Sequence, residues 1–123
     1  MLRRAGRARG EGSVVVGSGV VELSAAELGA GVVLGERATL VQFSTAFCQP
    51  WRATRRVLAQ VAALVPGVAH VDIDAEQHLE LVRRLEILRT PTTLVLDAHG
   101  TLVHRAAGQP RRAAVLAALA DAL

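Results

Sequence analysis

Short apolar runs alternate with amphipathic stretches along this chain, and the alternation predicts a domain of mixed α/β type. Three runs have the composition of buried strands, because apolar and β-branched residues dominate them: Thr39–Phe43, Val68–Val71 and Thr92–Leu96. A shorter strand is expected over Val20–Leu23. After the third run, Asp97–Gly100 has the residues of a tight turn, and Thr101–Arg105 is expected to return as an antiparallel partner.

Helical patterns fill the spaces between these strands. Ser24 has the sequence of a helix cap, and Glu27 three residues later completes a capping box. The longest helix is expected to begin at Pro50, a residue tolerated in a first turn, and to continue to about Val65. A further helix should follow Asp74 and reach about Leu85.

A last helix should open at Pro110 and turn its large apolar residues toward the core: Val115, Leu116, Leu119 and Leu123. The full element order is then β-α-β-α-β-α-β-β-α. Alternation followed by a hairpin predicts a mixed central sheet with helices on both faces and a C-terminal β-hairpin plus helix.

The length of 123 residues fits one folded domain. The distribution of charge distinguishes this domain from a basic segment at the start of the sequence. Residues 1–12 hold four of the 14 basic residues and one of the 11 acidic ones, so the remaining chain is balanced with ten of each. We interpret residues 1–18 as a basic, Gly/Arg-rich flexible leader and residues 19–123 as the domain. The leader leaves open a contact with phosphates or anionic lipid, but we expect no nucleic-acid partner, and no membrane tether is evident.

The single cysteine, Cys48, excludes an internal disulfide and fits a reducing compartment, so we expect a cytoplasmic location. We also expect a monomer. The only aromatic residues of the chain, Phe43, Phe47 and Trp51, bracket it. Cys48 follows a buried strand and precedes a helix, whose free N–H groups and dipole favour a thiolate and should lower the pKa of the thiol. The alternative is an inert cysteine buried as a small apolar residue.

Other candidate chemistry is weaker. The four histidines are scattered over different elements and none has metal-ligand spacing with Cys48, so we expect neither a metal site nor a cofactor. Arg52, Arg55, Arg56 and Arg89 could make the rim around the cysteine positive and suit an acidic segment or an anionic thiol. A solvated helix face explains the same arginines.

The residues around Cys48 resemble the active-site segment of the thioredoxin family, in which an aromatic residue precedes Cys-Gly-Pro-Cys and a basic residue follows. The segment here is Phe47–Arg52, with sequence Phe-Cys-Gln-Pro-Trp-Arg. Thr90-Pro91-Thr92 resembles the cis-proline loop of the family, Val71–Asp74 its hydrophobic-Asp strand end, and Gly108 the glycine before its final helix. The resemblance covers about residues 20–123 and implies a thioredoxin-like fold.

Transferred by position, the resemblance implies that Cys48 is the catalytic nucleophile. Thr90, Pro91 and Gly108 would line the groove beside the sulfur, in which the backbone of Thr90 pairs with an extended substrate segment. Gln49, Pro50 and Trp51 would complete the substrate-binding surface.

Three departures from the family pattern accompany these matches. Trp51 stands where the family has its second, resolving cysteine. Gln42 stands where the buried aspartate lies, and His70 where a lysine would pair with that aspartate. The resolving thiol and the carboxylate that serves it are therefore absent together, and an ordinary dithiol disulfide reductase is not expected.

Two functions remain open on the sequence. The first is monothiol thiol–disulfide exchange, in which Cys48 forms mixed disulfides with protein thiols or disulfides or with a low-molecular-weight thiol. The alternative is a non-catalytic module whose groove around Pro91 binds an extended peptide, with Trp51 as an apolar contact. A third reading, in which only the fold is retained, stands against both.

Overall fold

A computed structural model describes residues 15–16, 19–47 and 49–123 of the protein. Four strands form the central sheet: β3 (Ala38–Ser44), β4 (Val68–Asp74), β5 (Thr92–Asp97) and β6 (Leu102–Ala107). Their order across the sheet is β4-β3-β5-β6. The β3–β4 pair is parallel, whereas β5 is antiparallel to both β3 and β6. The predicted mixed sheet with a C-terminal hairpin is thus confirmed.

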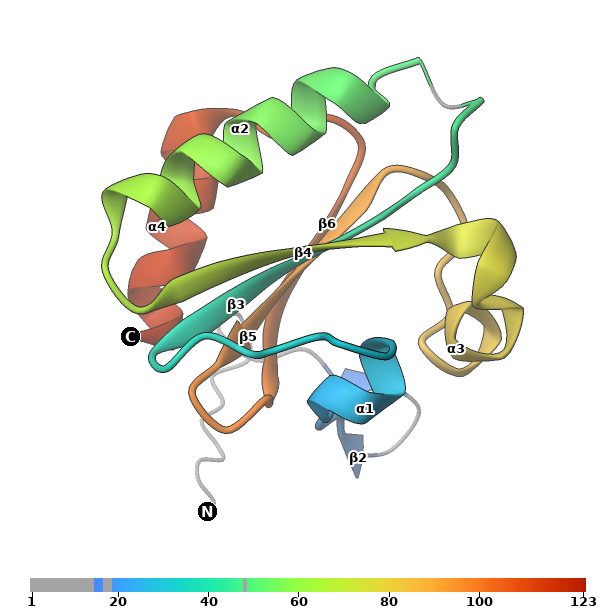
Figure 1. The fold of residues 1–123 in the computed structure, drawn as a ribbon, viewed down its shortest axis with the longest axis horizontal. Coiled ribbons are helices and arrows are strands. Elements are labelled where there is room, and N and C mark those ends of the chain that lie inside the picture. Colours follow the sequence, from blue (N-terminus) through green and yellow to red (C-terminus); the bar gives the residue numbers. More distant parts are fainter. Residues whose placement is uncertain (1–14, 17–18, 48) are drawn as a thin grey trace.

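Helices cover both faces of this sheet, as predicted (Figure 1). They are α1 (Ala25–Leu28), α2 (Trp51–Leu64), α3 (Leu79–Arg84) and α4 (Arg112–Ala122), with a 3₁₀ turn η1 (Ala75–Gln77) before α3. Figure 1 shows α2 and α4 together on one face and α1 and α3 on the other. Because β3 lies inside the sheet between two layers of helices, all seven of its residues are buried.

The core is divided by the sheet into two apolar layers. Val41 and Phe43 of β3 pack in the layer under α1 and α3, whereas Leu40 packs with Leu58 of α2 and Leu119 of α4. This division follows from the two-residue period of a strand, which sends successive side chains to opposite faces. Gln42 shares the parity of Leu40, so its side chain lies on the α2 face.

The segment before α1 differs from the expectation of one strand over Val20–Leu23. Strand β1 (Val15–Val16) pairs with β2 (Gly19–Val20), and Glu22 forms a separate bridge to Thr101. The Leu23 N–H then donates to the Gly100 carbonyl over 2.9 Å. Apart from Val15–Val16, the predicted leader over residues 1–18 lies outside the described residues.

Two helices also differ in detail from the sequence patterns. The helix expected after Asp74 is broken, because His78 leaves the helical region with φ −138° and ψ 48° and divides η1 from α3. The prediction that Leu116 of α4 and Leu123 at its C-cap face inward is wrong, since they are 38% and 49% exposed. The buried positions of α4 are Val115, Ala118, Leu119 and Ala122, which follow one helical stripe. None of the helices in the described part of the chain is long and apolar enough to cross a membrane.

Candidate functional site

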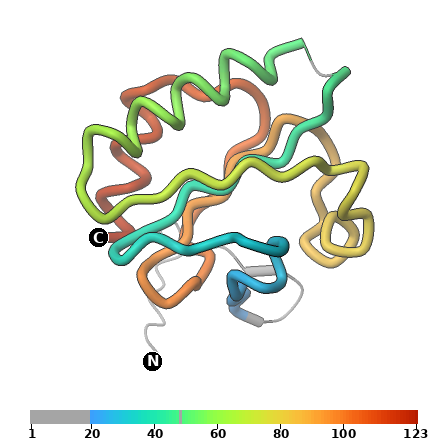
Figure 2. Tube along the Cα trace, in the orientation of Figure 1, coloured from blue at the N-terminus to red at the C-terminus, as the bar shows by residue number. Residues whose placement is uncertain are grey.

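The sheet brings three separate segments to one of its ends. Phe43, near the end of β3, pairs with Thr92 at the start of β5, and Thr92 also pairs with Ala107 at the end of β6. The segment that follows β3, the segment that precedes β5 and the segment that follows β6 therefore emerge side by side. Figure 2 shows these three stretches at the same end of the fold, near the beginning of α2. The predicted site residues lie on them or at the start of α2.

The segment before β5 is held in a defined turn. Its Thr90–Pro91 peptide bond is cis, and Pro91 is buried. The Gly108 N–H donates to the Pro91 carbonyl over 2.8 Å, and the Thr92 Oγ1 hydroxyl donates to the Arg89 carbonyl over 2.6 Å. These two bonds tie the turn to the segment after β6 and to β5 itself.

The backbone of Thr90 takes no part in these hydrogen bonds. Within the described residues, neither its N–H nor its C=O forms a backbone–backbone hydrogen bond, and the residue is half-buried. An unpaired donor and acceptor beside a strand end can pair with an added extended segment, as an exposed sheet edge does. The geometry of Thr90 thus suits a partner chain in extended conformation.

The segment after β3 carries the cysteine, and Cys48 itself lies outside the described residues. Its neighbours Phe47 and Gln49 are exposed, with 86% of Phe47 accessible to solvent. Pro50 is the N-cap of α2, and its carbonyl accepts the Thr54 N–H over 3.0 Å. The sequence position of Cys48 is therefore two residues before the cap of a 14-residue helix.

Trp51, which the motif resemblance aligns with the second cysteine, has partners of its own. Its indole Nε1–H donates to Oδ2 of Asp72 over 3.4 Å. The guanidinium carbons of Arg52 and Arg55 lie 5.8 and 5.5 Å from the ring centroid, within the range of cation–π attraction. Arg55 also forms a long ion pair with Asp72, with 3.9 Å between Nε and Oδ2. The indole is thus directed toward β4, whereas Pro91 precedes β5 on the other side of β3.

Gln42 and His70, which lie on the paired strands β3 and β4, are hydrogen-bonded to each other. Gln42 Oε1 lies 3.1 Å from His70 Nε2, and Gln42 Nε2 donates to the Trp51 carbonyl over 3.2 Å. Gln42 is completely buried, so these bonds satisfy an amide that water cannot reach. A carboxamide does not titrate near neutral pH, and this buried position therefore cannot relay a proton as a carboxylate would.

Burial is the main cause of the lowered pKa of His70, and the positive charge of Arg55 lowers it further. The carboxylate of Asp72 acts in the opposite direction and raises the pKa. The neutral imidazole is thus the favoured form in the fold, which suits a ring that shares a hydrogen bond with an uncharged amide.

Sequence reasoning missed the part that Asp72 and Ser44 play in this cluster. Asp72 pairs in register with Gln42, which places both side chains on the α2 face, and Ser44 Oγ lies 3.5 Å from Asp72 Oδ1. From the sequence alone, Asp72 is expected to be a strand-end residue. The signal that could have identified it is parity: residues 70 and 72 share a face, and the parallel partner presents Gln42 there.

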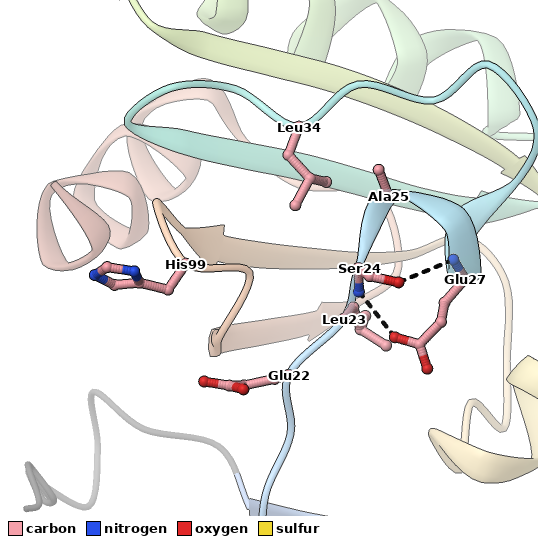
Figure 3. Close-up of a pocket in the computed structure, with 7 residues that line it drawn as sticks. All are labelled: Glu22, Leu23, Ser24, Ala25, Glu27, Leu34 and His99. Atoms are coloured by element: carbon pink, nitrogen blue, oxygen red, sulfur yellow. Dashed lines mark hydrogen bonds between the residues drawn. The ribbon is translucent and has the colours of Figure 1, made fainter.

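A separate hollow of about 450 Å³ lies at the opposite end of the sheet, near the turn between β5 and β6. Figure 3 shows that Ser24 and Glu27 on its wall bond to each other, with the capping-box distances of 3.2 and 2.8 Å. Its other lining residues are Glu22, Leu23, Ala25, Leu34 and His99. None of the predicted site residues in the described part of the chain lines it.

Comparison with solved structures defines the class of fold. A mutant thioredoxin from Halobacterium salinarum superposes with a TM-score of 0.65 at 18% identity, over 71% of this chain and 75% of that one. Fasciola hepatica thioredoxin gives 0.63 at 20% identity, over 72% and 84%. The protein therefore has the thioredoxin fold.

A curated relative takes the assignment from fold to family. Thioredoxin from Mycolicibacterium smegmatis is 33% identical over 95 residues, which are 74% of this chain and 84% of the relative. No family model matches the chain. On the strength of the curated relative, the chain belongs to the thioredoxin family, whose members act on protein thiols and disulfides.

Proposed function

We propose that this protein performs monothiol thiol–disulfide exchange through Cys48. The observation that carries the proposal is the sequence Cys48-Gln49-Pro50-Trp51 at the start of α2, in a family that works on thiols and disulfides. The nucleophile of the family motif is retained, and the resolving position holds a tryptophan whose indole bonds to Asp72.

The proposed reaction has two exchanges. In the first, the Cys48 thiolate attacks one sulfur of a substrate disulfide, a new S–S bond forms to Cys48, and the other substrate sulfur leaves as a thiolate that takes a proton from water. In the second, the thiolate of a low-molecular-weight thiol attacks the mixed disulfide. Cys48 leaves as a thiolate, and the substrate sulfur stays bonded to the external thiol. No net oxidation occurs in either exchange.

The rate of this cycle is set by the second exchange, in which an external thiol attacks the mixed disulfide. A neighbouring thiol in the same protein acts at an effective concentration that can reach about 10⁵ M, whereas a free thiol is present at millimolar level. The mixed disulfide should therefore persist far longer than in a dithiol protein. Capture or protection of a thiol partner suits such a protein better than rapid reduction of many disulfides.

We further propose that the substrate lies along Thr90, Pro91 and Gly108. The proposal is supported by the N–H and C=O of Thr90, which form no backbone–backbone hydrogen bond within the described residues, and by the carbonyl of Pro91, which Gly108 fixes. Gln49, Pro50 and the partly exposed Trp51 would contact the other side of that segment. We also propose that the protein acts in the cytoplasm, because an unpaired reactive thiol needs a compartment that keeps thiols reduced. The proposal further includes a monomer and a basic leader over residues 1–18 before the domain.

The test is intact-mass spectrometry of the reduced protein mixed with a peptide disulfide. The expected result is a one-to-one adduct at Cys48 that persists until glutathione is added. Cys48→Ser is the matched control and should form no adduct. If the wild type forms none, while Cys48→Ser still binds the same peptide noncovalently, the groove acts as a binding module and the exchange proposal is wrong.

A further inference from the structure

Arg89 spans the two segments that form the proposed groove. Its main chain precedes Thr90–Pro91, and its carbonyl is fixed by the Thr92 hydroxyl. Its guanidinium reaches toward the segment after β6, because a Cβ atom added to Gly108 would lie 3.9 Å from Arg89 Nη2. The cation is therefore placed over Gly108, at the end of the sheet where β3 leads toward Cys48.

The guanidinium of Arg89 has no protein anion among the described residues. Arg84 pairs with Glu27 at 2.9 Å and Arg55 with Asp72 at 3.9 Å, but no carboxylate of this part of the chain lies within 4.0 Å of Arg89. It also donates no hydrogen bond there and does not stack on Trp51, as Arg52 and Arg55 do. Its five N–H donors thus remain exposed to solvent and to a ligand.

Gly108 leaves the space that such a ligand needs. Its φ of +88° lies in the left-handed region that favours glycine, and the residue carries no side chain between the groove and Arg89. A carboxylate that approaches the guanidinium can therefore take the fork geometry of two parallel N–H···O bonds.

We propose that Arg89 and Gly108 form a carboxylate subsite next to the Thr90–Pro91 turn, which selects substrates that carry a carboxylate close to their reactive sulfur. This inference rests on the exchange function proposed above and names its substrate class. The carboxylate could belong to an Asp or Glu next to a peptide cysteine or to an anionic low-molecular-weight thiol. The first turn of α2 contains Arg52 and no acidic residue, so the surrounding field favours the same charge.

The experiment compares the rate of mixed-disulfide formation with two peptide disulfides that differ only in Asp or Asn beside the cysteine. We expect the wild type to react faster with the Asp peptide by roughly two- to fivefold, the size of an ion pair at the surface, because Arg89 is exposed. In Arg89→Gln this ratio should fall to about one. Arg37→Gln removes the same charge at the opposite end of β3 and should keep the wild-type ratio.

A second arm identifies the source of the carboxylate. Glutathione disulfide and its ethyl ester replace the two peptides, and a preference for the free acid that Arg89→Gln abolishes would indicate a small anionic thiol. Preference within the peptide pair alone would indicate an acidic protein segment. Equal rates for both members of each pair, or a ratio unchanged in Arg89→Gln, would overturn the subsite.

The subsite can also be tested without thiol chemistry. Cys48→Ser protein is titrated with the Asp and Asn peptides in which serine replaces cysteine, and the Gly108 amide is followed by NMR. A shift of this amide with the Asp peptide only, lost in the double variant with Arg89→Gln, supports the subsite even if no adduct forms with any disulfide. Equal shifts with both peptides, or none with either, would contradict it.

Discussion

The indole N–H of Trp51 donates a hydrogen bond to Asp72 on β4, over 3.4 Å. Trp51, which the motif resemblance aligns with the second cysteine, thus has polar and cationic partners of its own. Its main-chain carbonyl accepts the buried amide of Gln42 as well. Trp51 therefore contributes hydrogen bonds and cation–π contacts to this end of the fold, and its role is more than the replacement of a thiol.

Replacing Trp51 with cysteine tests whether the resolving thiol is the only missing element. Trp51→Cys should form an internal disulfide between Cys48 and the introduced thiol, detected as the loss of two hydrogens by mass spectrometry. It should also catalyse insulin reduction by dithiothreitol faster than the parent does, because an internal thiol outcompetes an external one. Trp51→Ser removes the same indole without adding a thiol and should show neither effect. A Trp51→Cys protein that keeps two free thiols after oxidation would contradict this view of the site.

The hydrogen bonds of Gln42 should be important for stability. Gln42→Ala leaves His70 and the Trp51 carbonyl without their partner and opens a cavity, so we expect the free energy of unfolding to fall by about 2 to 4 kcal/mol. Gln60→Ala, on the exposed face of α2, is the matched control and should stay within about 0.5 kcal/mol. Urea denaturation measures both, and similar losses in the two variants would show that the buried amide adds nothing.

Stability should depend on pH through His70. Its pKa is lowered in the fold, mainly by burial, from a value near 6.5 in the unfolded chain. As the pH falls below about 6.5, the unfolded state binds more protons than the folded state. The stabilisation of the fold that depends on a neutral His70 is therefore complete above that pH and decreases as the pH approaches the folded pKa. The measurement is the difference in unfolding free energy between the wild type and His70→Gln, from about pH 7.5 to about pH 5. On acidification, the unfolding free energy of the wild type should fall relative to that of His70→Gln. A difference that does not change with pH, or that changes in the opposite direction, would exclude His70 as the source of the pH dependence.

A pair of leucines in α4 tests which side of that helix faces the core. Leu119 is 1% exposed and Leu116 is 38% exposed. Leu119→Ala should lower the free energy of unfolding by about 3 kcal/mol, whereas Leu116→Ala should cost less than about 1 kcal/mol. The two substitutions remove the same atoms, so urea midpoints compare them directly. Equal costs would place the helix in a different rotation.

The difference between these leucines illustrates what the sequence could and could not reveal. Strands such as Thr92–Asp97 and the capping box at Ser24 were predictable, because each depends on local patterns. The inward side of α4 was not, since nearly every residue of this helix is apolar and no polar face marks the outside. Its small alanines, with Ala118 and Ala122 buried, allow α4 to pack close to the sheet.

The hydrogen-bonded cluster around Gln42 and Asp72 could not be predicted from the sequence for another reason. Gln42 and Asp72 are far apart in the sequence, and their proximity depends on the exact register of two parallel strands. The positions of Cys48, Thr90 and Pro91 within the site could be proposed from motif resemblance. The partners of Trp51 could not, because the family motif has no tryptophan there.

The most direct measurement of the central proposal is the rate of iodoacetamide alkylation of Cys48 as a function of pH. Cys48 is the only cysteine of the chain, so every alkylated thiol is the one in question. A sulfur that acts as nucleophile at the start of a helix should show a midpoint well below about 8.5, the value of a free thiol. A midpoint at or above that value would contradict the assignment of Cys48 as an activated nucleophile.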